Sequence, residues 1–92
     1  MISLTLSRIA DVLGGTLVLR GADSADTVVS GTVDTDSRLI GPGDIFVAKP
    51  GEHADGHDFV AAAIERGAVL AIVERPLDAA ITQIVVPGAV HA

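Results

Sequence analysis

The stretch that decides the fold covers residues 35–59 and reads TDSRLIGPGDIFVAKPGEHADGHDF. At its centre, residues 45–48 form a short apolar run, which is typical of a strand buried on both faces. Loops flank this strand, because Gly41-Pro42-Gly43 is a strong turn signal and a second glycine-containing segment follows at residues 49–56. Polar side chains therefore gather in loops beside one buried strand, and a rigid scaffold presents a ligand site in this way.

Helices are predicted before and after this strand. The clearer one covers residues 57–66, and its apolar residues recur on one stripe: Phe59, Val60, Ala63 and Ile64. Gly67 stands where its C-terminal cap belongs. The other helix covers residues 4–13, with Thr5 as its N-cap and Gly14-Gly15 ending it in a left-handed turn.

Short apolar or β-branched runs predict the strands, at residues 16–20, 28–33, 45–48, 70–74 and 83–86. Gly31 interrupts the second of these runs, where we expect a bulge or a close approach of two backbones. The strand–helix–strand order around the second helix requires a crossover connection. The sequence therefore predicts an α/β fold, with a small mixed or parallel sheet of about five strands flanked by two main helices.

The composition fits a single domain over residues 1–92. Hydrophobic residues make up 49% of the chain, but its only aromatic residues are Phe46 and Phe59, so we expect an aliphatic core around these two rings. The chain has no Cys, which excludes a disulfide framework and a thiolate zinc site and fits a cytoplasmic protein. Val90-His91-Ala92 carries no ending signal, and we expect the chain to continue in a longer protein.

Charge and hydropathy argue against two classes of partner. The formal net charge is −6 and Lys49 is the only lysine, whereas a nucleic-acid surface needs clustered Lys and Arg. No apolar run approaches the roughly 20 residues of a membrane span, and no basic segment precedes an apolar one at the N-terminus. We therefore expect no nucleic-acid binding, no membrane insertion and no signal peptide.

The first candidate site is the polar loop that contains Asp34, Asp36, Ser37 and Arg38. A hydroxyl and a guanidinium after a strand can bind an anionic ligand. Alternatively, one of the two aspartates pairs with Arg38 while Ser37 closes a local turn, and the residues alone favour this second interpretation.

The second candidate site lies between Gly51 and Asp58. A loop after a buried strand is where open α/β sheets bind ligands, although Gly51 also suits an ordinary turn. His53, Asp55 and His57 alternate and could bind a metal, but Gly56 predicts a turn and an Asp at the start of the next helix suits its dipole, so the pattern disfavours a metal site. No nucleophile is paired with these side chains, and the chain contains neither a G-x-x-x-x-G-K-[ST] nor a G-x-G-x-x-G pattern.

Several of these motifs together resemble the first domain of the bacterial Mur ligases. They are Asp36-Ser37-Arg38, the run from Pro42 to Ala48, Gly51-Glu52, the run from Asp55 to Phe59, and Gly67-Ala68. The resemblance extends from Leu4 to Val86, and Lys49-Pro50 departs from the family's pattern just before Gly51. It implies part of an enzyme that builds the peptide stem of peptidoglycan in the cell wall by ATP-driven amide bond formation.

The resemblance also implies a role for this domain and for six of its residues. In such ligases the first domain holds the UDP end of a UDP-N-acetylmuramoyl-peptide, while the remaining domains bind ATP with Mg2+ and the incoming amino acid or dipeptide. The substrate-binding residues that it implies are Thr35, Ser37, Arg38, Glu52, His53 and Ala54. It implies no catalytic residue, no metal ligand and no cofactor in the chain itself.

The resemblance has one main interpretation, and two alternatives to it remain open. Residues 4–15 and the form of the motif at residues 55–59 resemble the branch that adds D-alanyl-D-alanine to UDP-N-acetylmuramoyl-tripeptide. The other branch adds the third stem residue to UDP-N-acetylmuramoyl-dipeptide. A different class of function is a small acidic interaction module, which would have the same fold but no nucleotide-sugar site.

Overall fold

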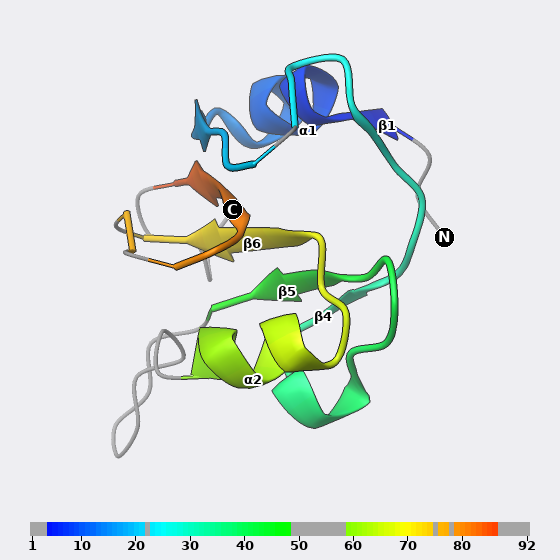
Figure 1. Cartoon of the computed structure of the whole chain (residues 1–92). Helices are drawn as coiled ribbons and strands as arrows, with labels where there is room; N and C mark the ends of the chain where they lie inside the picture. The colour runs from blue at the N-terminus through cyan, green and yellow to red at the C-terminus, as the bar shows by residue number, and fades with distance from the viewer. Residues whose placement is uncertain (1–3, 22, 49–58, 75, 78, 87–92) are drawn as a thin grey trace.

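A computed structural model describes residues 4–21, 23–48, 59–74, 76–77 and 79–86. The helical elements are α1 (Leu6–Leu13), the short 3-10 helix η1 (Ser37–Leu39) and α2 (Val60–Glu65). The strands are β1 (Leu4–Thr5), β2 (Thr16–Val18), β3 (Val28–Val29), β4 (Val33–Asp34), β5 (Ile45–Val47), β6 (Leu70–Val73) and β7 (Thr82–Val85). Figure 1 shows the sheet as a middle layer, with α1 on one side and α2 on the other.

The main sheet has five strands in the order β2-β7-β6-β5-β4. The last four run parallel to one another, and β2 adds to the edge antiparallel to β7. Helix α2 makes the crossover between the parallel neighbours β5 and β6, as a parallel pair requires. The prediction of an α/β fold with a mixed sheet of about five strands and two main helices is confirmed.

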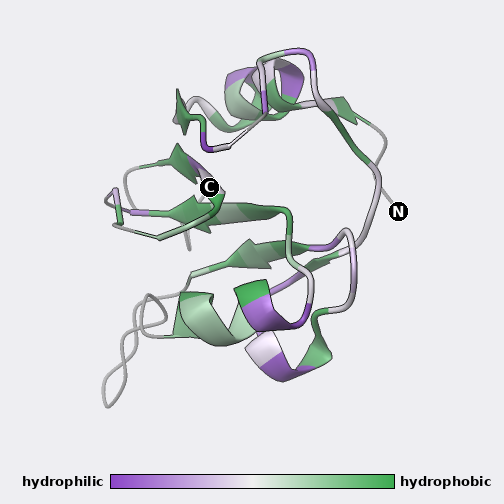
Figure 2. Ribbon diagram, viewed as in Figure 1, coloured by the Kyte–Doolittle hydropathy of each residue, from purple (hydrophilic) through white to green (hydrophobic). Residues whose placement is uncertain are grey.

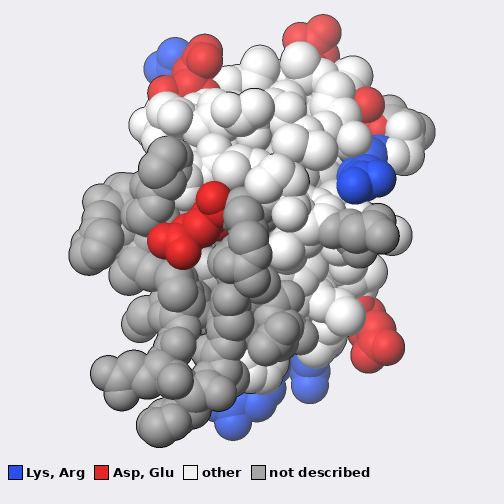
Figure 3. Space-filling model, turned by 90° about the vertical axis from the view of Figure 1, so that its left-hand side faces the viewer, with Lys and Arg blue, Asp and Glu red and all other residues white. Residues whose placement is uncertain are grey.

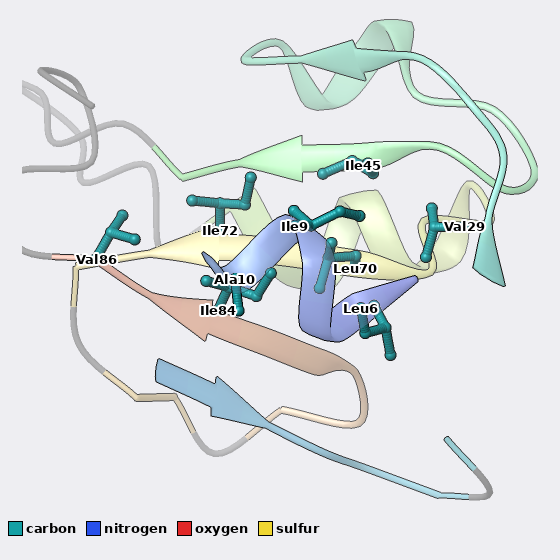
Figure 4. Packing of buried hydrophobic residues seen from close by; sticks show 9 residues of the cluster. All are labelled: Leu6, Ile9, Ala10, Val29, Ile45, Leu70, Ile72, Ile84 and Val86. Carbon is teal, nitrogen blue, oxygen red and sulfur yellow. The ribbon is translucent and has the colours of Figure 1, made fainter. Parts of the chain in front are cut away.

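Two hydrophobic clusters fill the spaces above and below the sheet. The cluster on the α1 side, shown in Figure 4, consists of Leu6, Ile9, Ala10, Val29, Ile45, Leu70, Ile72, Ile84 and Val86. The cluster on the α2 side consists of Ile40, Phe46, Ala48, Val60, Ala63, Ala71, Val73, Ile81. Figure 2 shows the central strands of the sheet coloured hydrophobic, whereas α1 carries both hydrophobic and hydrophilic residues. Strand β5 contributes to both clusters, because successive side chains of a strand point to opposite faces.

Helix α1 has the two caps that its sequence predicts, although it begins at Leu6, because Leu4 and Thr5 belong to strand β1. The hydroxyl oxygen of Thr5 accepts a hydrogen bond from the backbone N–H of Arg8 at 3.2 Å, which caps the first turn. Gly14 follows the last turn with φ of 68°, in the left-handed region that glycine adopts without strain. The prediction of both caps is confirmed.

The predicted role of Phe59 in the core is wrong. Its side chain is 44% exposed, whereas Phe46 is 1% exposed. Phe59 precedes the first residue of α2 and occupies the N-cap position, so the helical stripe that faces the sheet starts one residue later. Val60 and Ala63 make the contact with the sheet instead.

The predicted strand at residues 28–33 is divided in two. Val28–Val29 pairs with β1 in a separate two-stranded sheet, and Val33–Asp34 pairs with β5 in the main sheet. Gly31 lies between the two parts, where a Cβ atom would stand only 2.2 Å from the carbonyl oxygen of Gly43. The close backbone approach predicted at Gly31 is therefore confirmed, and it brings the chain past the Gly41-Pro42-Gly43 turn.

Asp44 holds this turn in place. Its carboxylate accepts hydrogen bonds from the backbone N–H of Gly41 at 2.9 Å and of Thr32 at 3.1 Å. Both hydrogen bonds favour the charged form of Asp44 and hold its pKa below its ordinary value. The bond from Gly41 makes the largest contribution to this shift of the pKa. One side chain thus joins the start of β4 to the turn before β5.

A buried side chain of β7 holds the connection between β6 and β7 by hydrogen bonds. Gln83 of β7 is fully buried, and its side-chain oxygen accepts a hydrogen bond from the backbone N–H of Leu77 at 2.8 Å. Its side-chain nitrogen donates to the carbonyl oxygen of Leu77 at 2.8 Å. A buried amide needs such partners, because leaving it without them costs about 1–3 kcal/mol.

Replacing Gly31 by Ala tests the close approach. Since the new Cβ atom meets backbone and not a flexible side chain, we expect Gly31→Ala to lower the free energy of unfolding by about 3 kcal/mol. Urea denaturation followed by circular dichroism measures the change. Gly41→Ala is the matched control, because the nearest atom to its Cβ position is a carboxylate oxygen of Asp44 at 3.6 Å. Equal stability of the two variants would contradict the assignment.

Candidate functional site

A hollow of about 560 Å3 opens at the carboxyl end of β4. It is lined by Thr35, Asp36, Ser37, Arg38 and Phe59. Strands β4 to β7 are parallel, so their carboxyl ends meet at one edge of the sheet, and open α/β sheets bind ligands at this edge. The volume lies within the roughly 300–1,000 Å3 of small-molecule sites.

Aspartate side chains fold the loop that lines this hollow. The carboxylate of Asp34 accepts a hydrogen bond from the backbone N–H of Asp36 at 2.9 Å. The carboxylate of Asp36 in turn accepts one from the backbone N–H of Arg38 at 2.9 Å, which caps η1. An Asp at every second position therefore turns the chain twice in succession directly after β4. Ile40 then enters the cluster on the α2 side and fixes η1 to the body of the domain.

Asp36 and Arg38 form a two-pronged ion pair at the hollow. Nη2 of Arg38 donates to Oδ2 of Asp36 at 2.8 Å, and Nε donates to Oδ1 at 3.0 Å. The Arg38 side chain is 82% exposed, and the hydrogen bonds from its guanidinium and its backbone N–H lower the pKa of Asp36 to about 2. The pairing of an aspartate with Arg38, which the sequence favours, is thus present and involves Asp36. The pair occupies two of the five guanidinium N–H donors.

Three of the six substrate-binding residues implied by the resemblance line this one hollow. They are Thr35 and Arg38, which are exposed, and Ser37, which is buried apart from 8% of its surface. The other three, Glu52, His53 and Ala54, lie outside the described residues, as does the departure at Lys49-Pro50. Their role stays a prediction.

Phe59 is the lining residue that the sequence analysis assigned elsewhere. It was expected in the core because it falls on the apolar stripe of the second helix. A signal for its position was its place near the predicted start of that helix, because the ends of a helix are the least certain part of a sequence-based assignment. The side chains of Asp55 and Asp58, expected at the helix start, are not among the described residues.

A second hollow, of about 490 Å3, lies at the opposite, amino end of β6 and β7. Its polar groups mostly bond to one another. The hydroxyl of Thr82 donates to the carboxylate of Asp23 and accepts from the backbone N–H of Arg20 at 3.1 Å. This network ties the segment after β2 to β7, so the hollow at residues 35–38 is the better candidate for a ligand site.

The charged side chains of the described residues are dispersed over the face that Figure 3 shows. Figure 3 shows the basic side chains on one face standing in separate places, with acidic ones among them. In the ranges that the structure covers, no three His, Cys, Asp or Glu side chains are grouped so that they could hold a metal ion. His53, Asp55 and His57, weighed as a metal site from the sequence, fall in the segment left undescribed. None of the helices in the described ranges is both long enough and apolar enough to span a bilayer.

Comparison with known proteins explains the motif pattern. The family model described as "Mur ligase family, catalytic domain" matches residues 31–92, a segment that includes β4, η1 and the whole lining of the hollow. The chain belongs to the Mur ligase family. The resemblance stated from the motifs alone is therefore confirmed.

Individual Mur ligases match over most of the chain. The UDP-N-acetylmuramoyl-tripeptide–D-alanyl-D-alanine ligase of Mycobacterium tuberculosis is 46% identical over 95% of the chain. The UDP-N-acetylmuramoyl-L-alanyl-D-glutamate–2,6-diaminopimelate ligase of Chlorobaculum tepidum is also 46% identical, over 91% of it. A crystal structure of MurF from Acinetobacter baumannii superposes with a TM-score of 0.79 at 35% identity, over 97% of this chain and 19% of that one. The chain spans 17% of the length of each of these two curated relatives.

The ion pair gives a direct titration test. Because the guanidinium of Arg38 is the largest cause of the shift, Arg38→Ala should raise the pKa of Asp36 from about 2 toward its ordinary value of 3.8. Carboxyl-carbon NMR during an acid titration measures both values. Arg66→Ala is the control, since Arg66 contributes the smallest of the causes. An unchanged pKa in Arg38→Ala would contradict the geometry.

The same pair predicts how stability depends on pH. The folded-state pKa of Asp36 lies below 3.8, so the charged form stabilises the native state above that pH, and this contribution is lost as the pH falls toward about 2. In Arg38→Ala this part of the acid dependence should be smaller. Thermal melting between these two pH values, compared with Arg66→Ala, measures the difference.

Proposed function

We propose that this chain is the N-terminal substrate-binding domain of a Mur ligase that adds D-alanyl-D-alanine to UDP-N-acetylmuramoyl-tripeptide. The hollow beside η1 holds the UDP end of that substrate. The observation that carries the proposal is the placement of Thr35, Ser37 and Arg38 together at the carboxyl edge of the parallel strands. Members of the family with this activity, by name, match nearly the whole chain.

The role of the domain in this proposal is to position the substrate and not to carry out the chemical step. Holding a reactant in near-attack geometry supplies much of the rate of a two-substrate reaction. Although the matching family model is described as a catalytic domain, the chain has no phosphate-loop pattern and only one lysine. Its residues therefore do not fit an ATP site, and we assign ATP and Mg2+ to the other domains of the ligase. A cytoplasmic location fits such an enzyme.

The lining side chains suit a polar, partly anionic ligand. The hydroxyls of Thr35 and Ser37 can each donate and accept hydrogen bonds, and Arg38 keeps three N–H donors beyond the two that bind Asp36. The net charge of −6 repels a ligand with two phosphates. Hydrogen-bond donors in the hollow must therefore outweigh this repulsion. We expect modest affinity from this domain alone, because the whole ligase shares the substrate among its domains.

The diaminopimelate-adding branch is the second candidate. Its Chlorobaculum tepidum member reaches the same 46% identity as the Mycobacterium tuberculosis ligase. Both branches take a UDP-N-acetylmuramoyl-peptide, and their substrates differ at the peptide end. An acidic interaction module without a nucleotide-sugar site is the remaining alternative.

An NMR titration of the labelled chain with UDP-N-acetylmuramoyl-tripeptide tests the proposal. We expect shifts at residues 35–38 and at 51–54, stronger than with UDP-glucose as the comparison ligand. Ser37→Ala should weaken binding about fivefold through the loss of one hydrogen bond, whereas Ser30→Ala, an exposed serine outside the hollow, should not. An absence of shifts at millimolar ligand would favour the interaction module. An equal response to UDP-N-acetylmuramoyl-dipeptide would mean that this domain does not distinguish the two branches, and that the domains that bind the peptide end do.

A further inference from the structure

Most of the described lining of the hollow belongs to one segment at the edge of the main sheet. This lining segment, residues 32–41, contains β4, η1 and the run from Thr35 to Arg38. Strand β4 is the outermost strand of the sheet, and it pairs with β5 over two residues. A segment with so short a ladder needs other anchors if its side chains are to keep fixed positions.

Both ends of the lining segment bond to one carboxylate. Oδ1 of Asp44 accepts a hydrogen bond from the backbone N–H of Thr32 at 3.1 Å, directly before β4. Oδ2 accepts one from the backbone N–H of Gly41 at 2.9 Å, at the other end of the segment. The side chain of Asp44 therefore closes the lining segment into a loop.

The backbone of Asp44 is fixed to the body of the domain. Its carbonyl oxygen accepts a hydrogen bond from the backbone N–H of Val69 at 2.9 Å, directly before β6. The next residue, Ile45, begins β5 and is 1% exposed. The carboxylate therefore extends from a fixed point of the sheet to the two ends of an edge segment.

Asp44 acts on the lining segment in a different way from the aspartates within it. Asp34 and Asp36 accept hydrogen bonds inside the segment and shape its turns, whereas Asp44 fixes its ends. Phe59, the other described residue of the lining, comes from the start of α2. The shape of the hollow therefore depends on where the whole segment lies relative to α2, and the ends determine that position.

We propose that Asp44 is a positioning residue for the candidate site, which holds the lining segment in place without touching the ligand. Asp44 itself is not among the described residues that line the hollow. The inference rests on the proposed function, because it names what holds the substrate-binding side chains in position. If one end of the segment is released, ligand binding must restore its position, and this lowers the affinity.

An amide in place of the carboxylate tests the proposal. Asp44→Asn keeps the shape of the side chain, but it offers one acceptor oxygen and turns an N–H group toward the second backbone donor. Thr82→Val is the matched control, because it also removes a side chain that accepts a hydrogen bond from a separate segment, at the N–H of Arg20. Thr82 is likewise absent from the described lining of the hollow.

NMR titration with UDP-N-acetylmuramoyl-tripeptide measures the affinity of the wild-type chain and of both variants. Urea denaturation measures their stability, and each titration is made where the variant is folded. We expect Asp44→Asn to bind about tenfold more weakly than the wild type, because its lining segment is less often in the competent position. Thr82→Val should lose stability but bind within about twofold of the wild type, since its bonds are independent of the segment.

Hydrogen exchange of the wild-type chain gives a second measurement that does not depend on a variant's folding. Coupling between two sites is reciprocal, so bound ligand should strengthen the bonds to Asp44 by the factor that their loss weakens binding. Saturating ligand should therefore slow exchange at the N–H groups of Thr32 and Gly41 about tenfold. The N–H of Leu77, which bonds to the side chain of Gln83, is the control and should exchange at an unchanged rate.

The outcomes separate this inference from the proposed function. Wild-type affinity in Asp44→Asn, or exchange at Thr32 and Gly41 that the ligand does not slow, would overturn the role of Asp44 and leave the nucleotide-sugar site standing. An equal loss of affinity in Thr82→Val would overturn it too, because affinity would then follow overall stability. If the wild-type chain does not bind UDP-N-acetylmuramoyl-tripeptide, the proposed function fails and the inference fails with it.

Discussion

Burial of one short strand on both of its faces is the constraint on which the rest of the structure depends. Ile45 of β5 packs toward α1 and Phe46 packs toward α2, and both are 1% exposed. Burying a side chain of this size contributes about 1.5–3 kcal/mol, and a small domain has few such residues. Two helices must therefore cover opposite faces of the sheet, and a crossover through α2 supplies one of them. That crossover also sets the start of α2 beside the end of β4, where the hollow lies.

The loop at this edge gets its shape from local bonds. Asp34 and Asp36 each accept a backbone hydrogen bond from the residue two positions later, so the turn does not depend on distant partners. Arg38 is held by the same carboxylate that caps η1. The entropic cost of ordering these side chains is incurred during folding, so a ligand that enters the hollow finds these groups already in place. This preorganisation suits a domain whose proposed task is positioning.

Local patterns predicted those features that a few neighbouring residues determine. The cap at Thr5, the left-handed Gly14 and the buried run at residues 45–48 each depend on side chains or glycine preferences within one turn or strand. The division of residues 28–33 could not be predicted fully, because Val28–Val29 finds its partner in β1 and only the folded chain shows it. The hydrogen bond between Gln83 and Leu77 could likewise not be predicted, because only the folded chain brings the two residues together.

The candidate site, too, could be predicted from the sequence only in part. The family resemblance implies Thr35, Ser37 and Arg38 as substrate-binding residues, and the structure shows that all three line one hollow, while their role stays a prediction. The choice of Asp36 over Asp34 as partner of Arg38 depends on the turn that Asp34 makes. Helical periodicity gives the apolar stripe but not the residue at which the helix begins; α2 begins at Val60, so Phe59 precedes the helix and lines the hollow instead of packing in the core.

The separation of the core into two clusters by the sheet has a consequence for mutational tolerance. Substitutions on the α1 face, such as at Leu6 or Ile9, act on a cluster that shares no residue with the one behind the hollow. The stability of the domain can therefore be changed through that face while the cluster behind the hollow keeps all of its residues.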